Sequence, residues 1–437
     1  MTVGMIIGLV ALAAFLAMIF LGIPVTFSMM ACGTVGAMFV LRTPLSAITL
    51  LQDSVFASFT SYTLCVAPMF ILMGELATES KIGGDLFDCF QKLFGHRKGG
   101  LASASQVVCA IFGAICGSTA ATGAMMSRIA YPQMKRFQYD DMLSAGSIAS
   151  GSCLASLIPP SMHLITYGIA AEESIGKLLM GGITTGIVLM ILFIITVRIW
   201  CRVNPSVAPA SEANASVREK LVAIRKGGFI EIVLVFALAM GGMFAGWFTP
   251  TESGAVGFAG MLIVAILFRR FSVGVLKKAL RNTMVMTGMI YCLMAGANCF
   301  GRFFTLTKIP NQLGALVQYL GIPAIGVIAV LTVMYLVLGC FIDGVALILL
   351  TTPIFLPVVE ASGFSSLWFG CYMVVIVGLG AVTPPVGMNC YIVSGVSGVP
   401  LDRVFRGSMP FVFAYVAMAL LLALVPGIAT ALPNLVM

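Results

Sequence analysis

Long apolar runs recur from one end of the chain to the other, and they constrain its fold more than any other feature. A helix needs roughly 20 apolar residues to cross a bilayer, and in lipid every backbone group must find its partner within the protein. The runs lack the alternation of apolar and polar residues that barrel strands show. Since 60% of the residues are hydrophobic and only 9% are charged, we predict an all-α polytopic membrane protein. The clearest runs are 5–22, 183–199, 230–247, 255–268 and 409–425.

Lysine and arginine gather in a few connectors between these runs, and the positive-inside rule makes those connectors cytoplasmic. The segment 101–131 has basic residues on both flanks, so we expect it to enter and leave the membrane from the cytoplasm as a hairpin. Counting the crossings from there places the N-terminus and the C-terminus on the side of the membrane opposite to the cytoplasm. No basic residue precedes the first apolar run, which favours a retained span over a cleaved signal. The basic clusters are at 92–98, 135–136, 198–226, 269–281 and 403–406.

An internal repeat is indicated by landmarks that share one offset. Pro159-Pro160 recurs as Pro384-Pro385, 225 residues later, and the same offset relates Pro132 to Pro357 and Gly182 to Gly407. Chance matches are the alternative, because glycine and proline are common in membrane helices. An odd number of crossings separates the two copies, so the second copy is inverted. We predict a first repeat at 1–203, a cytoplasmic linker at 204–228 and a second repeat at 229–437, with hairpins near 101–131 and 324–357 and broken helices near 142–172 and 366–397.

The tip of the first hairpin reads GAICGSTAAT from Gly113 to Thr122. Glycines and small hydroxylated residues interrupt an apolar helix there, and exposed backbone groups at membrane depth are tolerated only where they line a cavity. Ser118 and Thr119 add hydroxyl groups suited to Na⁺ or to a carboxylate. Close helix packing through small residues is the alternative.

The repeat offset places Asp343 opposite Ser118, in the second hairpin. A carboxylate within an apolar run is costly and needs a partner or a function. Asp343 is therefore the strongest single candidate for a functional residue. It can also cap the second helix of its hairpin through backbone N–H groups, and the two roles are compatible.

The two Pro-Pro sequences remove backbone donors and push the preceding residue out of the helical region. Each helix must unwind there, which frees carbonyl groups next to Ser156 and Ser161 in the first copy and Thr383 and Asn389 in the second. We predict an oxygen-rich ion or substrate site near the middle of the bilayer. A simple kink satisfied by a neighbouring helix is the alternative.

Enzyme signatures are missing from the sequence: it contains no HExxH, no Walker A loop and no GxSxG. The 12 cysteines form no CxxC pair, which argues against a zinc site. His96 falls in a basic connector, and His163 follows Ser161 closely enough to touch a substrate, although a lone histidine is more often packed. We predict a protein that is not an enzyme and that draws on an ion gradient or on another subunit.

Four segments in order, GHRKGGLASASQVVCAIFGAICGSTAAT, LIPPS, TPTESGAVG and GLGAVTPPVGMN, resemble the large membrane subunit of tripartite ATP-independent periplasmic (TRAP) transporters. The resemblance covers essentially the whole chain. It implies a Na⁺-coupled elevator mechanism in the bacterial inner membrane. It also implies two partners, a small four-helix membrane subunit and a periplasmic binding protein that delivers an organic acid.

By position, the resemblance implies two or more Na⁺ sites and a substrate between them. This chain reads Ser118-Thr119 where paired serines are frequent in the family. The Na⁺ ligands would be Gly117, Ser118, Ser156 and Ile158 in the first half, and Gly339, Gly380 and Thr383 in the second. The substrate would touch Ser118, Thr119, Ser161, Asp343 and Asn389.

We therefore predict a Na⁺-driven secondary importer of an organic anion that works as the large subunit of a three-part system. C4-dicarboxylates, sialic acid and small sulfonates all remain open as substrates. The first alternative is a stand-alone ion-coupled anion symporter or exporter of the same architecture. A channel is the second alternative, and a membrane enzyme is the weakest.

Overall fold

The computed structural model describes residues 3–80, 82–94, 98–209, 229–310 and 323–436, together with 312, 315 and 319. All regular elements among these residues are helical, so the predicted all-α fold is confirmed. The predicted linker lies outside the described residues from 210 to 228. The longer helices are α1 (Val3–Phe20), α2 (Val25–Leu41), α3 (Pro44–Thr60), α4 (Val66–Glu79), α5 (Ile82–Phe94), α6 (Gly100–Cys116), α7 (Thr119–Arg136), α8 (Asp141–Ser152), α9 (Met162–Ala170), α10 (Ile175–Val203), α12 (Phe229–Phe236), α14 (Pro250–Leu267), α15 (Val273–Thr307), α17 (Ala324–Gly339), α18 (Gly344–Ala361), α19 (Ser366–Gly380), α20 (Met388–Ser397), α21 (Leu401–Leu424) and α22 (Gly427–Val436).

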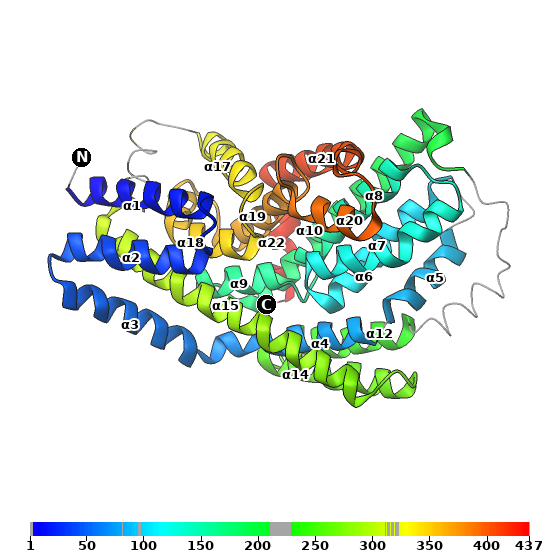
Figure 1. Ribbon diagram of the computed structural model, residues 1–437, viewed down its shortest axis with the longest axis horizontal. Helices are drawn as coiled ribbons and strands as arrows, with labels where there is room; N and C mark the ends of the chain where they lie inside the picture. The colour runs from blue at the N-terminus through cyan, green and yellow to red at the C-terminus, as the bar shows by residue number, and fades with distance from the viewer. Residues whose placement is uncertain are drawn as a thin grey trace.

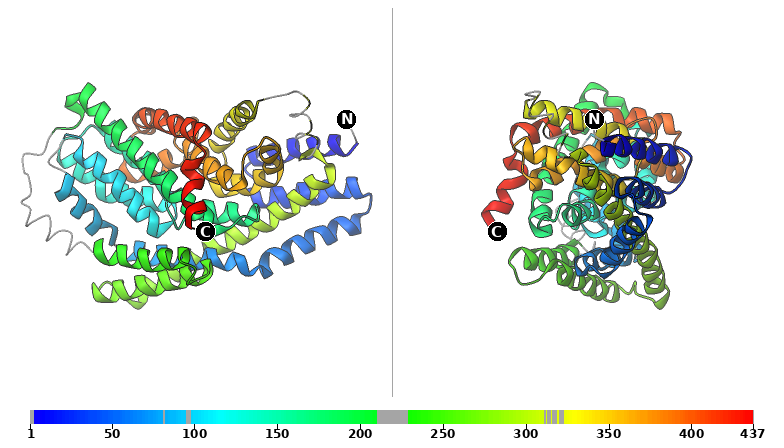
Figure 2. Two further views of the ribbon diagram at one scale, coloured as in Figure 1. Left: turned by 180° about the vertical axis from the view of Figure 1, so that it is seen from behind. Right: turned by 90° about the vertical axis from the view of Figure 1, so that its left-hand side faces the viewer.

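The helices form an elongated bundle in which α1, α2 and α3 lie side by side at one end (Figure 1). The long helix α15 packs against α2, α3 and α4 and runs along much of the molecule. The hairpin of α6 and α7 lies toward the other end, near α8 and α5 (Figure 2). The long helices α10 and α21 pack against this region, α10 on α6 and α21 on α8.

Six described helices are long and apolar enough to cross a bilayer: α1, α10, α14, α15, α18 and α21. The pair of α3 and α4, joined through the short turn η1 (Tyr62–Cys65), forms one more candidate span with a bend of 49°. The runs singled out in the sequence did not include this pair. Pro68 lies in the first turn of α4, where a missing N–H is tolerated.

The helix order follows the offset found in the sequence. The second helix of each hairpin begins at Thr119 and at Gly344, and the helix before each break begins at Asp141 and at Ser366. Both pairs are 225 residues apart. The bent pair of α3 and α4 departs from this pattern, because the corresponding α15 is continuous. The ends of the two repeats, at residues 203 and 229, stay a prediction.

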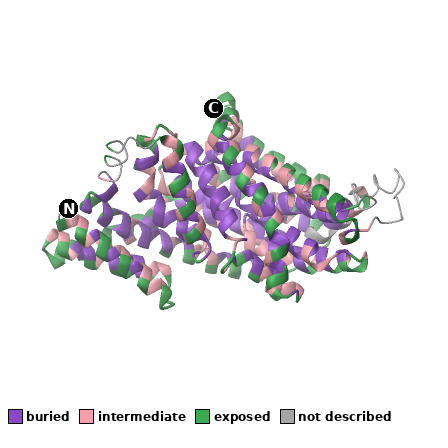
Figure 3. Cartoon of the chain, turned by 90° about the horizontal axis from the view of Figure 1, so that it is seen from above, coloured by how far each residue is buried: buried purple, intermediate pink, exposed green. Residues whose placement is uncertain are grey.

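Buried residues are concentrated in the centre of the bundle, and exposed ones follow its rim (Figure 3). The helices α8 and α21 approach very closely, because a methyl group on Gly146 would lie 2.1 Å from the carbonyl carbon of Gly407. A methyl group on Gly407 would in turn lie 2.0 Å from the carbonyl oxygen of Met142. Only glycine permits this approach, which fixes α21 against the helix that leads into the first break.

Candidate transport site

The first hairpin turns at Gly117 and Ser118. Gly117 has a φ of +63°, and its N–H donates to the carbonyl of Gly113 at 2.7 Å, which closes the last turn of α6. Ser118 caps α7, because its hydroxyl accepts the N–H of Ala121 at 3.3 Å. Ser118 and Thr119, the first residue of α7, are both half-buried. Two hydroxyl groups therefore stand at the N-terminal end of a helix.

The first Pro-Pro break separates α8 from α9 and contains the short turn η2 (Cys153–Ser156) and the cis peptide Pro159-Pro160. Ser161 caps α9 by accepting the N–H of Leu164 at 3.1 Å, and its own hydroxyl donates to the carbonyl of Ser156. The Ser156 hydroxyl donates to the carbonyl of Cys153 at 2.6 Å. The two serines predicted at this break thus replace part of the hydrogen bonding that the prolines remove.

The first hairpin tip rests directly on the first break. A methyl group on Gly117 would lie 2.6 Å from the carbonyl oxygen of Pro160. One turn earlier, a methyl group on Gly113 would lie 2.7 Å from the Cα atom of Ala155. Glycine is required at both contacts because backbone meets backbone. The fold therefore brings the predicted tip and the predicted break of the first half together.

Ile158 occupies the opposite side of this break. Its Cγ1 atom would lie 2.5 Å from a methyl group on Gly186 of α10. Its side chain lines an apolar cavity of about 360 Å³ between α6, α10 and α12. Any contribution of Ile158 to an ion site is therefore limited to its backbone carbonyl.

The second hairpin meets the second break in a similar way. Gly339 ends α17 and Gly380 ends α19, and a methyl group on Gly380 would lie 2.9 Å from the carbonyl carbon of Gly339. The thiol of Cys340 donates to the carbonyl of Pro384 at 3.3 Å. The Thr383 hydroxyl donates at 2.7 Å to the carbonyl one turn earlier. The glycines predicted in the second half are thus in direct contact with each other.

Asp343 caps α18. Its Oδ1 atom accepts the N–H of Val345 at 3.0 Å and that of Ala346 at 3.4 Å. Ser118 occupies the same position at the start of α7, 225 residues earlier. The capping role expected from the sequence is confirmed, and the helix dipole favours a carboxylate there. Asp343 is half-buried at the tip.

The two breaks differ in exposure. Pro159 and Pro160 are buried, whereas Pro384 and Pro385 are exposed at the surface of the chain, and Met388 is 40% exposed. In this conformation only the prolines of the second break are exposed at the surface of the chain. The repeat is therefore approximate at the site itself.

The two halves of the chain contact each other around Asn389 of the second broken helix. The side-chain nitrogen of Asn389 donates to Oγ of Ser152 at 3.1 Å and to Sγ of Cys153 at 3.0 Å. Asn389 is only 2% exposed. Its two hydrogen bonds connect α20 of the second half to the end of α8 and the start of η2 in the first half. The helices after the breaks also pack across, α9 against α18 and α20 against α7. Each broken helix therefore supports the hairpin of the opposite half.

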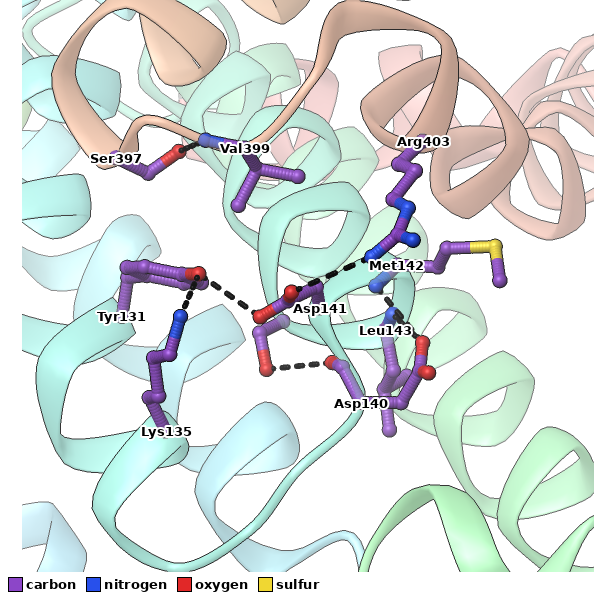
Figure 4. A network of polar contacts seen from close by, with 10 residues as sticks. Tyr131, Lys135, Asp140, Asp141, Met142, Leu143, Ser397, Val399 and Arg403 are labelled. Atoms are coloured by element: carbon purple, nitrogen blue, oxygen red, sulfur yellow. Dashed lines mark hydrogen bonds and ion pairs between the residues drawn. The ribbon is translucent and has the colours of Figure 1, made fainter.

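A network of polar side chains joins α7, α8 and α21 at the end of the first hairpin away from its tip (Figure 4). Asp141 accepts the hydroxyl of Tyr131 at 2.8 Å and lies 3.7 Å from Nη1 of Arg403. Lys135 donates to the same tyrosine oxygen at 3.3 Å. Asp140 caps α8 by accepting the N–H of Met142 at 2.8 Å. These bonds fix where α8 begins, and thereby the path of the helix toward the break.

The donor atoms around the tips fit Na⁺. They are carbonyl and hydroxyl oxygens, which hard cations prefer and which unwound membrane helices commonly offer to Na⁺. No cluster of three or more His, Cys, Asp or Glu side chains occurs within the described part of the chain, so a transition-metal site has no ligand set there. The predicted Na⁺ ligands stay a prediction.

Some residues at the site were missed by the sequence reasoning. Ser152 and Cys153 were not singled out, and His163 was not placed beside the second hairpin. Cys153 could have been identified from the sequence, because it lies 225 residues before Gly378 and is therefore its equivalent in the repeat. The carbonyl of Gly378 accepts the thiol of Cys153 at 3.7 Å. His163 had no such signal, since its position beside Gly344 depends on how α9 packs on α18.

Candidate membrane spans, two helical hairpins and two broken helices with polar groups where they meet define a polytopic membrane transporter. Residues 12–428 match the family described as "Tripartite ATP-independent periplasmic transporter, DctM component". The chain belongs to this family, whose members are transporter permeases.

Two relatives cover almost the whole chain. The C4-dicarboxylate TRAP transporter large permease protein DctM of Pseudomonas aeruginosa is 32% identical over 403 residues, which is 92% of this chain and 93% of that protein. The ectoine TRAP transporter large permease protein TeaC of Halomonas elongata is 30% identical over 434 residues, 98% of this chain and 99% of that protein. The chain is therefore similar in length to both permeases.

The fold is also similar to a solved structure, that of Neisseria gonorrhoeae MtrF. The TM-score is 0.55 at 13% sequence identity, with 86% of this chain and 84% of that chain covered. At this identity the likeness concerns the fold alone.

Proposed function

We propose that this chain is the large membrane subunit of a Na⁺-coupled TRAP importer of an organic acid. The observation that carries the proposal is the contact of each hairpin tip with its own break, at Gly117 and Pro160 in one half and at Gly339 and Gly380 in the other. These contacts bring backbone carbonyls and hydroxyl groups together at each tip, and Asp343 adds a carboxylate at the second tip. Such an arrangement suits a cation and an organic anion that bind together.

Na⁺ binds at both tips in this proposal. In the first half the ligands come from Gly117, Ser118, Ser156 and the carbonyl of Ile158. In the second half they come from Gly339, Gly380 and Thr383. Na⁺ offsets the charge of Asp343 and the field of the converging carbonyls, so the organic anion binds well only after the cation. This order of binding couples the transport of the substrate to the Na⁺ gradient.

The substrate lies between the tips. Ser118, Thr119 and Asp343 are half-buried and form the accessible part of its site. Ser161 and Asn389 are buried and already donate hydrogen bonds within the protein. We assign these two residues to the floor of the site, where they hold the first break and the opposite half in place.

The hairpins and broken helices move as one body against the long helices in this proposal. Each predicted repeat, 1–203 and 229–437, contributes one hairpin and one broken helix to this body. The tight crossing at Gly146 and Gly407 holds α21 to α8, so α21, although long, moves with this body. A contact between the two bodies is at Gly74 of α4, where a methyl group would lie 2.7 Å from the backbone of Cys116.

Membership of the family supports the proposed partners, a small membrane subunit and a periplasmic binding protein, and a place in the bacterial inner membrane. The basic connectors support the proposal that both termini of this chain are in the periplasm. The substrate is an organic acid such as a C4-dicarboxylate, sialic acid or a sulfonate. Ectoine is a further candidate because the relative from Halomonas elongata is named for it.

Reconstituted transport tests the proposal. The chain and its small membrane subunit are placed in proteoliposomes, and the binding protein is added with succinate, N-acetylneuraminate, isethionate or ectoine in turn. We expect uptake of one compound that requires an inward Na⁺ gradient, saturates, and stops when K⁺ replaces Na⁺. Uptake that continues in K⁺ would exclude Na⁺ coupling.

The same preparation separates the alternatives. A stand-alone symporter transports without the binding protein and the small subunit, and an exporter accumulates the compound in vesicles of the opposite orientation. A channel gives conductance that neither saturates nor depends on a fixed Na⁺ stoichiometry.

A further inference from the structure

His163 lies where the first half meets the tip of the second hairpin. It is the second residue of α9 and is 8% exposed. A methyl group on Gly344, the first residue of α18, would lie 2.6 Å from Nε2 of His163 and 2.9 Å from its Cδ2. Glycine at this position therefore lets the imidazole contact the backbone that carries Asp343.

The imidazole and the Asp343 carboxylate interact electrostatically. Asp343 uses Oδ1 for both of its capping bonds. The other ring nitrogen of His163, Nδ1, is buried and has no hydrogen-bond partner among the described residues. A buried polar atom without a partner is unusual in a folded protein and calls for an explanation. A nitrogen that takes up a proton during the transport cycle would be one.

Other titratable side chains lie on α9 and on the elements that pack against it. The helix packs against α18, α10, α19, α4 and η2. Within the described chain, Asp343 is the one charged group that interacts with His163. The remaining titratable side chains on these elements and on α9 are Glu75, Glu79, Cys153, Tyr167, Lys177, Arg198, Cys201, Arg202, Glu360, Cys371 and Tyr372.

An organic anion that binds beside Asp343 brings a second negative charge to a poorly hydrated site. Repulsion between like charges is strong there, so the bound state needs compensating positive charge. Histidine is the side chain that gains a positive charge between about pH 5 and pH 8. Its contact with Gly344 at the tip of the second hairpin allows it to supply this charge close to Asp343.

We propose that His163 takes up one proton when the organic anion binds next to Asp343, and that it is a positioning residue that makes transport depend on pH. The proton comes from the solution on the side of binding and is released from the imidazole with the substrate on the other side. Na⁺ supplies the rest of the compensating charge. The inference rests on the proposed function, because it needs an anion at Asp343.

The test measures Na⁺-driven uptake by the complete system at several pH values between 5.5 and 8.0. The probe is whichever of succinate, N-acetylneuraminate and isethionate the wild-type system transports. We expect the KM of the wild-type protein to rise with pH, by about tenfold per pH unit at most, the limit for one proton, while kcat changes little. His163→Gln should have a KM that is independent of pH and close to the wild-type value at pH 8.0. His96→Gln, which changes the chain's other histidine, serves as the control and should keep the wild-type slope.

A second readout does not depend on the variant. In weakly buffered detergent solution, the wild-type membrane complex should take up a proton when the probe and Na⁺ are added at pH 7. A flat wild-type KM, an unchanged slope in His163→Gln, or no proton uptake would each overturn the inference while Na⁺-driven transport persists. Absence of Na⁺-driven uptake of any compound in the wild type would instead contradict the proposed function.

Discussion

Cys153 and Gly378 touch at the centre of the molecule, where the thiol of Cys153 donates to the carbonyl of Gly378 at 3.7 Å. The two residues are separated by 225 residues, the same offset that relates the two Pro-Pro breaks. A residue meets its own equivalent only near the axis of an approximate two-fold repeat. Asn389 binds Ser152 and Cys153 next to this contact. The axis of the approximate repeat therefore passes close to Asn389, a residue of the proposed site.

The hydrogen bond between Asn389 and Ser152 should measurably stabilise the contact between the halves. Asn389 also bonds Cys153, and Ser152 also donates to the carbonyl of Ala149 at 2.8 Å. Removal of either partner therefore costs one hydrogen bond, about 1 kcal/mol. Ser152→Ala should therefore destabilise the wild-type protein more than it destabilises the Asn389→Ala variant, as measured by unfolding of the detergent-solubilised complex.

Ser150 offers a matched control for this cycle. It lies on the same helix, and its buried hydroxyl has no hydrogen-bond partner within the described chain. Ser150→Ala should have the same effect in both backgrounds. Equal effects of Ser152→Ala in both backgrounds would show that the bond does not join the halves.

Asp343 combines a capping role with a proposed role in transport, and two substitutions separate them. Asparagine caps helices about as well as aspartate, whereas loss of a cap costs about 1 kcal/mol. Asp343→Asn should therefore keep the stability of the wild type and lose most Na⁺-dependent uptake, because the charge is gone. Asp343→Ala should lose both stability and Na⁺-dependent uptake.

The measurements for Asp343 are thermal unfolding in detergent and uptake in proteoliposomes. Full uptake by Asp343→Asn would limit this residue to the capping role. Wild-type stability in Asp343→Ala would contradict the capping role itself.

The positions of the hairpins and breaks were predictable because each leaves a local mark in the sequence. Pro159-Pro160 and Pro384-Pro385 forbid a continuous helix, and a carboxylate such as Asp343 within an apolar run is costly away from a helix end. The shared offset then related Ser118 to Asp343, and the structure has both residues as N-caps. Local chemistry and the repeat were sufficient for this part of the fold.

Gly117 should tolerate no side chain. Its φ of +63° disfavours other residues, and a methyl group would lie 2.6 Å from the carbonyl oxygen of Pro160. The backbone strain alone costs about 1–2 kcal/mol, and the collision would separate the tip from the break. We expect Gly117→Ala to lower both the unfolding temperature and the Na⁺-dependent uptake.

Gly288 of α15 is the control for this substitution, because a methyl group there meets nothing within 4 Å. Alanine is favoured over glycine inside a helix by about 1 kcal/mol, so Gly288→Ala should keep or raise stability and leave uptake unchanged. Equal behaviour of the two variants would mean that the tip does not need its contact with Pro160.

Contacts between distant segments were beyond the sequence because they depend on packing in three dimensions. The crossing of Gly146 and Gly407 illustrates this: Gly407 was identified as a landmark of the repeat, but nothing in its neighbourhood names Gly146 as its partner. The difference in exposure between the two breaks has the same origin. It reflects which long helices cover Pro160 in this conformation, and a repeat in sequence carries no information about that.

Asp140 and Arg403 both belong to the polar network at the start of α8, but they should contribute unequally to the stability of the protein. Asp140 caps α8 through the N–H of Met142 at 2.8 Å. Arg403 reaches Asp141 at 3.7 Å with 55% of its side chain exposed. An exposed ion pair contributes about 0.2–1 kcal/mol and weakens with salt, whereas loss of an N-cap costs about 1 kcal/mol and does not depend on salt in the same way.

Asp140→Ala should therefore lower the unfolding temperature of the detergent-solubilised complex more than Arg403→Ala, and 0.5 M NaCl should reduce only the effect of Arg403→Ala. Asp140→Asn, which keeps a capping side chain, should remain close to the wild type. If Arg403→Ala were the more damaging change, the ion pair rather than the cap would set the start of α8. Because α8 leads into the first break, a displaced start should also reduce Na⁺-dependent uptake, and Asp140→Ala is expected to show that loss.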